Sequence, residues 1–315
     1  MAVLQYTIQD YSAYVNMSNR KKLLVEGPDE KRFFDFLRGH KKNWFDSLDI
    51  DDACIIASPH ERLGNREKIE RVNVLIEKTS FSDKFLGLVD REFRGFDLED
   101  RIVDTINSHY IDGRLIWTMG HSIENYFLDY DLLNYTISTL STSPYCRNAM
   151  IVFKDIFPSI LQLSCAVSLA CFEINNFAFL YQFLSWEIFN LDETRIEINY
   201  QTLEEELRNQ NVPEEWISSL LTRIPFWYQQ VIDSEPLNPK WLNHGHLSLS
   251  IMWASFQKCI SVCCNSNYIS TEISHTLQAN ANVKFNTCAQ KYLSTIDLDN
   301  NAFPKCLFQQ LNVVS

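Results

Sequence analysis

Residues 23–34 read "LLVEGPDEKRFF", an apolar run that stops at Glu26 and turns into a charged segment. The Leu-Leu-Val run is typical of a strand, and the Gly-Pro pair after Glu26 predicts a helix start, because proline fits the first helical position. Asp29 and Glu30 then fall in the first turn, where negative charge is favourable. Glu26 has no such helical role, so it is the first candidate functional residue.

The first 140 residues repeat this alternation of apolar runs and amphipathic segments. The strands that we expect are residues 22–26, 53–58, 85–90 and 114–119. The helices that we expect are residues 29–39, 65–78, 97–109 and 122–134. Continuous apolar runs fit strands buried on both faces, so the pattern predicts an α/β fold with a parallel sheet. Right-handed crossovers then place the strand ends at one edge, where such folds bind ligands.

Carboxylates follow two of these strands. Glu26 ends the first strand and Asp90 ends "FLGLVD", so the two should be neighbours at the ligand-binding edge. If that strand continues two residues further, Glu92 projects to the same face as Asp90. Crowded carboxylates repel one another unless a cation lies between them, and oxygen ligands suit Mg²⁺ or Mn²⁺. The sequence therefore predicts a metal site formed by Glu26, Asp90 and Glu92.

Composition divides the chain near "STLSTSPY", residues 138–145. Seven of the eight glycines lie before residue 121, and eight of the nine cysteines lie after residue 145. We expect a first domain over residues 1–140 and a mainly α-helical domain over residues 145–315. The second domain carries fewer charges, which favours a role in dimerisation or in binding a partner or substrate.

The net charge of −12 opposes nucleic-acid binding over the chain as a whole. Basic residues nevertheless surround the predicted acidic edge, and Lys31, Arg91 and Arg94 are the candidates for contacts with substrate phosphates. A membrane span needs roughly 18 apolar residues without interruption, and the sequence contains no such stretch. Nine cysteines without paired spacing are typical of free thiols, so we expect a cytoplasmic protein.

Two of these motifs together resemble the TOPRIM fold, which topoisomerases, primases and OLD-family nucleases share. "VEGPDEKRFF" is similar to its first glutamate motif, and "LVDREF" is similar to its Asp-x-Asp motif, with Glu92 in place of the second aspartate. "GHSIENYFLDYDLL", residues 120–133, resembles the subgroup encoded beside ABC/AAA-type ATPases in bacterial anti-phage loci. Within this subgroup the similarity is closest to the effectors of PARIS defence systems.

The resemblance implies a metal-dependent nuclease, released from an ATPase partner as a toxic effector that cleaves host tRNA. It implies that Glu26, Asp90 and Glu92 bind Mg²⁺ or Mn²⁺, that Glu30 is an outer ligand or base, and that Glu124 belongs to the catalytic set. It also implies a homodimer when the effector is free. The chain has no GxxxxGK[ST] loop, so ATP-driven switching must come from the partner.

Four alternative interpretations stay open at this point. The first alternative is that the chain is a non-catalytic TOPRIM docking subunit of an ATPase complex. The second is that it is a nuclease that cleaves DNA. Glu124 also fits a helix-start charge next to Ser122. His244 and His246 have the spacing of metal ligands, but two histidines without a nearby carboxylate in the sequence are more often structural.

Overall fold

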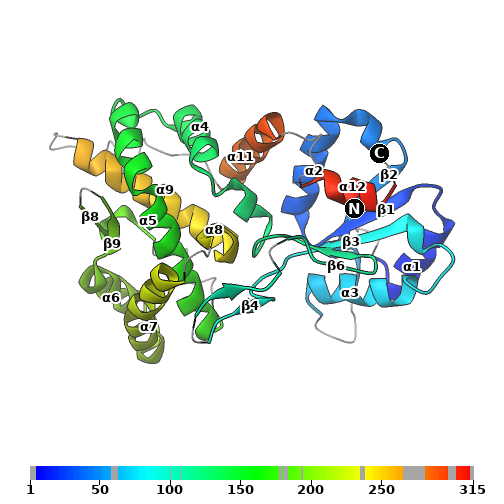
Figure 1. The fold of residues 1–315 in the computed structure, drawn as a ribbon, viewed down its shortest axis with the longest axis horizontal. Coiled ribbons are helices and arrows are strands. Elements are labelled where there is room, and N and C mark those ends of the chain that lie inside the picture. The colour runs from blue at the N-terminus through cyan, green and yellow to red at the C-terminus, as the bar shows by residue number, and fades with distance from the viewer. Residues whose placement is uncertain are drawn as a thin grey trace. The chain divides into compact units, whose positions relative to one another are not determined.

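The computed structural model describes residues 5–57, 63–99, 101–106, 108–176, 180, 184–192, 194–234, 238–264, 281–296 and 303–312. The chain forms two compact units and passes between them several times (Figure 1). The first comprises Met1–Arg91, Asn107–Met119 and Ala289–Ser315, and the second comprises Glu92–Ile106 and Gly120–Cys288. The expected linker, residues 138–145, lies within the second unit, where it comprises the last turn of one helix and the short connection to the next.

The first unit is built on a five-stranded sheet. Its strands lie in the order β2 (Leu48–Asp52), β1 (Lys21–Val25), β3 (Phe85–Val89), β7 (Leu115–Trp117) and β6 (Ile111–Asp112). The first four are parallel, whereas the short β6 pairs with β7 in the antiparallel direction. This arrangement confirms the expected α/β class with a mostly parallel sheet.

Helices cover both faces of this sheet (Figure 1). They are α1 (Ile8–Met17) and α3 (Asn65–Ile76) on one face, and α2 (Pro28–His40) and α12 (Lys305–Gln310) on the other. Leu24 of β1 packs with Tyr11 and Val72 in the core beneath α1 and α3. On the opposite face, Phe34 of α2 packs against Phe308 of α12, with ring centroids 6.2 Å apart. Because β1 is covered on both faces, its last three residues, Leu23, Leu24 and Val25, are all apolar and fully buried.

The second strand lies earlier than the sequence predicted. The expected strand at 53–58 is wrong, because residues Ala53–Ile55 form a 3₁₀ turn and Ile56 makes an isolated bridge with Tyr6. Asp52 begins this turn by accepting a hydrogen bond from the backbone N–H of Cys54 at 3.1 Å. The true strand, β2, is the sheet edge, where charged side chains are common, and its three aspartates hid it from a search for apolar runs.

Two predicted helices also differ from the structure. The helix expected at 97–109 is wrong, because β4 (Phe96–Asp97) and β5 (Val103–Asp104) pair there in an antiparallel ladder. Residues Ile123–Phe127 form a 3₁₀ helix, and α4 (Tyr130–Leu140) begins only after Asp129. Asp129 starts α4, because its side chain accepts from the backbone N–H groups of Asp131 and Leu132.

The second unit is mainly helical, as expected for this half of the chain. Its described elements after α4 are α5 (Cys146–Glu173), the β8 (Phe189–Leu191) and β9 (Ile196–Ile198) hairpin, α6 (Tyr200–Asn209), α7 (Glu214–Asp233), α8 (Pro239–Leu242) and α9 (Gly245–Cys263). The helix α11 (Ala281–Thr295) begins in this unit and ends in the first. The central helix is α5, which packs against α7 and α9.

The helix α5 is long and apolar enough to cross a membrane by length and composition. However, 67% of its most apolar window is buried inside the structure, as in the core helix of a soluble domain. All nine cysteines are free thiols.

Gly87 of β3 provides a test of the packing between α3 and the sheet. A Cβ atom at this position would lie 2.6 Å from Ile69 Cγ2 and 2.7 Å from Leu115 Cδ2. We expect Gly87→Ala to lower the free energy of unfolding by about 1–3 kcal/mol through overpacking. Gly39 of α2 has open space around it, so Gly39→Ala should instead raise stability by about 0.5–1 kcal/mol. Urea unfolding measures the free energy of unfolding of both variants. A change of the same sign in both would contradict this packing.

Candidate functional site

The sheet edge of the first unit brings two of the predicted ligands together. The strands β1 and β3 are parallel neighbours, with Leu23 opposite Leu86 and Leu24 opposite Gly87. Glu26 and Asp90 are the first residues after these strands, so they leave the sheet at the same edge. Glu26 Oε1 accepts a hydrogen bond from the backbone N–H of Asp90 at 2.8 Å. This bond holds the Glu26 carboxylate across the end of β3.

A third carboxylate comes from the start of α2. Glu30 is 9% exposed and lies in the first turn of this helix, after the N-cap Gly27. A Cβ atom on Gly27 would lie 3.1 Å from Glu30 Oε2, so the Glu30 carboxylate folds back over the turn that follows Glu26. The exposed N–H groups of the helix start favour negative charge here. Asp29 is engaged by Arg32 at 2.9 Å.

Lys31 adds a basic group to the same edge. Its Nζ lies 3.3 Å from Asp52 Oδ2 at the end of β2, and its side chain remains 37% exposed. A partly exposed lysine that is held at 3.3 Å by one exchangeable ion pair can turn towards a substrate phosphate at little cost. Lys31 is therefore suitably placed for the phosphate contact that the sequence predicted.

Arg91 is placed differently from the prediction. Its side chain is fully buried, and its Nη1 donates to the carbonyl of Met119 at 2.9 Å. Its backbone N–H donates to Thr118 Oγ1 at 2.9 Å. A phosphate contact would require Arg91 to leave this position and expose the end of β7. The role that this geometry supports for Arg91 is structural, and the predicted phosphate contacts of Lys31 and Arg94 stay predictions.

Glu92 lies beyond the end of its strand. The strand β3 ends at Val89, and Glu92 has a φ of 51°, so strand alternation does not put it on the face of Asp90. Its backbone N–H donates to the carbonyl of His121 at 2.9 Å, within the second unit. Its role as a metal ligand stays a prediction.

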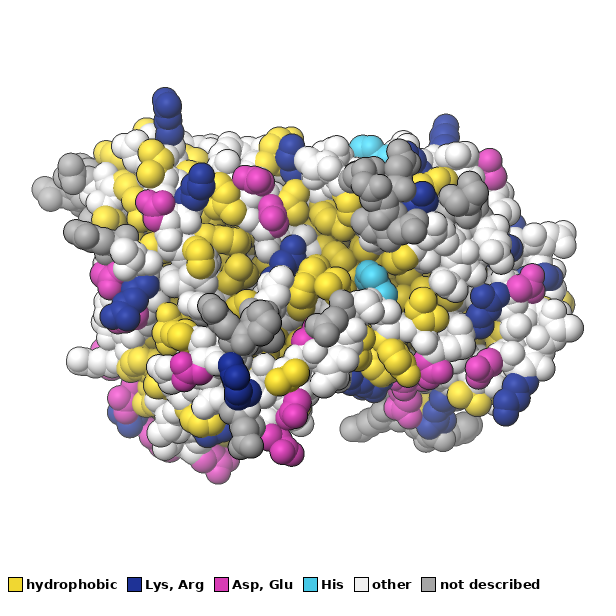
Figure 2. All heavy atoms as spheres, viewed as in Figure 1, with side chains coloured by type: hydrophobic (Ala, Val, Ile, Leu, Met, Phe, Trp, Pro, Cys, Tyr) yellow, Lys and Arg dark blue, Asp and Glu magenta, His cyan; other side chains and the backbone are white. Residues whose placement is uncertain are grey.

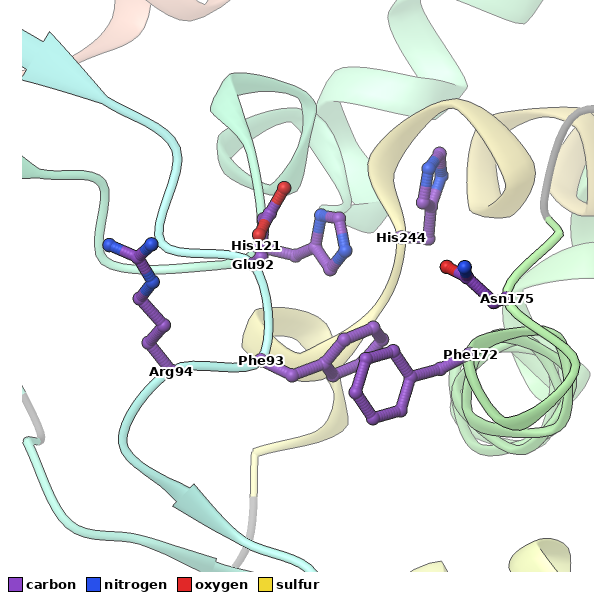
Figure 3. A pocket seen from close by; sticks show the side chains of 7 residues that line it. All are labelled: Glu92, Phe93, Arg94, His121, Phe172, Asn175 and His244. Carbon is purple, nitrogen blue, oxygen red and sulfur yellow. The ribbon is translucent and has the colours of Figure 1, made fainter. Parts of the chain in front are cut away.

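The second unit contains a cavity of about 390 Å³ into which Glu92 faces. Figure 3 shows the residues that line it, which are Glu92, Phe93, Arg94, His121, Phe172, Asn175 and His244. The Phe93 ring lies 4.5 Å from Phe172 and 4.8 Å from His121, and His121 lies 4.7 Å from His244, as centroid distances. Four rings thus form a nearly continuous wall. No pattern in the sequence predicts this grouping, because its members come from four separate segments.

Hydrogen bonds between two segments bring the imidazoles of this wall together. The backbone N–H of His121 donates to the carbonyl of Trp241 at 2.8 Å. Asn125 Nδ2 donates to the carbonyls of Lys240 and Asn243, at 2.6 and 2.8 Å. His244 begins α9, where Nδ1 accepts from the backbone N–H of Leu247 at 3.4 Å. Burial lowers the pKa of His244 to about 4, with a smaller contribution from His246, so the ring is neutral at pH 7.

Glu124 lies beside this cavity with a histidine that the sequence left unassigned. Glu124 is 2% exposed, and its Oε2 accepts from Ser122 Oγ at 2.6 Å. Its Oε1 lies 3.5 Å from Nδ1 of His246, whose side chain is 57% exposed. Gly245 permits the approach, since a Cβ atom there would lie 2.6 Å from the Cβ of Glu124. A carboxylate that orients an accessible imidazole in this way is suited to proton transfer or to metal ligation through the second nitrogen.

No protein-family model matches the chain, and no curated protein matches it.

The depressed pKa of His244 predicts a pH-dependent stability. Between about pH 6.5 and 4, the unfolded chain binds a proton at this residue that the folded chain does not. As the pH is lowered through this window, the free energy of unfolding should therefore decrease, by up to about 3 kcal/mol. His244→Asn keeps an acceptor for the N-cap but does not titrate. On acidification this variant should therefore lose less stability than the wild type does.

Urea unfolding at pH 7 and pH 4 measures the difference. His40→Asn, an exposed position at the end of α2, is the control and should behave as the wild type does. Identical losses in the wild type and in His244→Asn would show that His244 titrates normally in the folded chain.

Proposed function

We propose that this protein is a metal-dependent phosphodiesterase that cleaves nucleic acid, with RNA as its substrate. The observation that carries the proposal is the pairing of Glu26 with Asp90 at the carboxyl ends of two adjacent parallel strands, where the Glu26 carboxylate accepts the Asp90 N–H at 2.8 Å. Ligands in such folds bind at this edge. The resemblance of the two motifs to TOPRIM nucleases supports the same chemistry.

The donor set at this edge suits Mg²⁺ or Mn²⁺. Both ions take carboxylate oxygens, and Mg²⁺ is commonly held by one or two carboxylates, with waters and substrate phosphates at its other positions. Glu26 and Asp90 would hold the ion, which when bound supplies charge stabilisation at the phosphate. Nine cysteines and seven histidines elsewhere in the chain offer softer ligands, but none of them is needed for this site.

The other residues at the edge have roles that follow from their positions. Glu30, buried at the helix start and close to the turn that follows Glu26, is placed to accept a proton from the attacking water. Lys31 follows it on the exposed side and would neutralise a phosphate. A water nucleophile, a base and a phosphate ligand are what phosphodiester hydrolysis requires.

The competing interpretation is a docking module that has lost its catalytic role. Such a module needs no divalent ion, whereas Glu26 and Asp90 lie together at one strand edge, as carboxylates that share an ion would. The proposal extends to the biological setting that the resemblance implies, a tRNA-cleaving effector of an anti-phage system that an ATPase partner restrains. It also includes a homodimer of the free effector.

Removing one metal ligand should abolish cleavage without unfolding the chain. Glu26→Gln keeps an oxygen that accepts the N–H of Asp90 but loses the charge that holds a divalent ion. We expect Glu26→Gln and Asp90→Asn each to lose several orders of magnitude of rate, because the metal stabilises the transition state. Glu67→Gln, a surface glutamate paired with Arg71 in the same unit, is the matched control and should retain full activity.

The measurement is cleavage of total cellular RNA and of isolated tRNA by the purified chain with millimolar Mg²⁺ or Mn²⁺. A parallel reaction with plasmid DNA distinguishes an RNase from a DNase. Cleavage that is equal in the wild type and in Glu26→Gln would refute the assignment. A wild-type protein that folds, binds Mn²⁺ and cleaves no nucleic acid would favour the docking module.

Metal binding should also raise thermal stability. A ligand that binds only the folded chain stabilises it by about 2.7 kcal/mol at one hundred times its dissociation constant. We expect millimolar Mn²⁺ to raise the melting temperature of the wild type and of Glu67→Gln, and to leave Glu26→Gln unchanged. A rise of equal size in all three proteins would place the bound ion elsewhere.

A further inference from the structure

The cavity of the second unit is not used by the proposed chemistry of the sheet edge. Its volume of about 390 Å³ lies in the range of small-molecule sites, and most of its wall is aromatic. Phe93, Phe172, His121 and His244 provide the rings, and Figure 3 shows them arranged around one space. Polar groups are few: the Glu92 carboxylate, the Asn175 carboxamide and the guanidinium of Arg94.

Two of the lining residues have an uncommon backbone conformation. Glu92 and Asn175 have φ angles of 51° and 50°, in the left-handed region. Asparagine tolerates this region at a helix end, and Asn175 follows α5 in this way, but glutamate is rarely found there. Such strain clusters at sites that bind ligands. In this case it turns Glu92 towards the cavity, beside His121 (Figure 3).

The end of α5 presents two groups that suit a ligand. The Phe172 side chain is 44% exposed, although it packs against Phe93. The Asn175 carboxamide points into the space between Phe172 and His244 (Figure 3). Among the described residues no hydrogen-bond partner of this carboxamide is found. The cavity thus has an exposed aromatic ring and an amide next to each other. These two groups suit a planar ligand with a polar edge.

We infer that this cavity binds a single unstacked base of the nucleic-acid substrate. The rings offer π faces, and stacking of a base on an aromatic side chain is the common means of holding single-stranded RNA. The Asn175 carboxamide has a donor and an acceptor side by side, which matches the edge of a base, and the Glu92 carboxylate accepts from an exocyclic amino group. Arg94 points away from the ring wall in Figure 3, as a contact to the adjoining phosphate requires.

The charge state of the wall is consistent with a base rather than an anion. His244 is neutral at pH 7 because burial lowers its pKa to about 4, so no imidazolium is available there to bind a phosphate. Glu92 also repels anions. The two imidazoles pack ring against ring at an interplanar angle of 50°. A base that lies against this ring wall gains stacking on one face, whereas a phosphate would lose its hydration for little return.

This inference rests on the proposed function for the identity of the substrate, so its test avoids catalysis. The full chain carrying Glu26→Gln is titrated in EDTA with the four nucleoside 5′-monophosphates by calorimetry. It is also crosslinked under ultraviolet light to a single-stranded RNA containing 5-iodouridine, and the modified peptide is identified by mass spectrometry. We expect binding of at least one nucleotide and a crosslink to Phe93, Phe172 or a flanking cavity residue.

Two pairs of matched variants decide whether the cavity is the site. Phe172→Ala should weaken binding by about tenfold or more, the usual effect of losing one stacking ring. Phe226→Ala, which removes a phenylalanine of similar exposure on α7, should not change it. Asn175→Gly keeps the left-handed backbone and loses the amide, and it should weaken binding too. Asn211→Gly, at another asparagine with a φ of 58°, should leave binding unchanged.

Nucleotide binding that survives both Phe172→Ala and Asn175→Gly would overturn the inference, as would a wild-type cavity that binds no nucleotide. A site that instead takes up Zn²⁺ in a manner abolished by His121→Ala would overturn it in favour of a metal centre. If RNA cleavage depends on Glu26 while base binding is absent, only this inference fails. If base binding depends on Phe172 while no cleavage is observed, the cavity assignment stands and the proposed function fails.

Discussion

The parallel pairing of β1 with β3 is the constraint on which the first unit depends. It joins segments 64 residues apart at Glu26 and Asp90, and the carboxylate of the first accepts the backbone N–H of the second. The same pairing requires Gly87, because α3 and β7 leave no room for a side chain at that point of β3. Core packing and the acidic edge are thus fixed by one strand register. A slip of one residue would turn the apolar face of β1 towards the wrong helices.

The polar residues of β1 and β2 are part of this arrangement rather than exceptions to it. Lys22 is 1% exposed, and its Nζ contacts Tyr14 Oη at 2.6 Å and Asp49 Oδ2 at 2.7 Å. Its pKa is raised because the hydrogen bonds to Asp49 and Tyr14 outweigh the opposing effect of burial, the largest single contribution. Hydrogen bonds of this kind make a buried charge tolerable. The bond from Lys22 to Tyr14 also attaches α1 to the sheet. A second bond, from the Tyr11 hydroxyl to Asp51 at 3.0 Å, does the same.

In the second unit, the comparable organising element is the contact between residues 120–125 and the turn that leads into α9. Its hydrogen bonds run from Asn125 and His121 to backbone carbonyls, so they depend little on neighbouring side chains. They bring His121 against His244 and Glu124 against His246. Neither histidine of the "NHGH" segment could be assigned from its spacing, since the carboxylate partner lies 122 residues earlier in the chain.

Local pattern was sufficient for much of the fold. The strands at β1, β3 and β7 and the helices at α2 and α3 were predicted within two residues or so, because each is a continuous apolar or amphipathic segment with a clear start signal. The sequence by itself also determined the α/β class and the meeting of Glu26 and Asp90, since parallel strands have their carboxyl ends at one edge. Edge strands and short ladders were missed because their exposed positions carry charges, as in β2.

Only the tertiary structure decided the positions that depend on contacts between distant segments. It buried Arg91 against the end of β7, ended β3 before Glu92, and gathered four rings from four segments into one cavity. None of these outcomes has a periodic signature, because side-chain direction after a strand ends is set by the φ angle of the next residues and by the partner that those residues meet. Sequence specifies regular elements through local preference, whereas a site built from turns requires the packed chain.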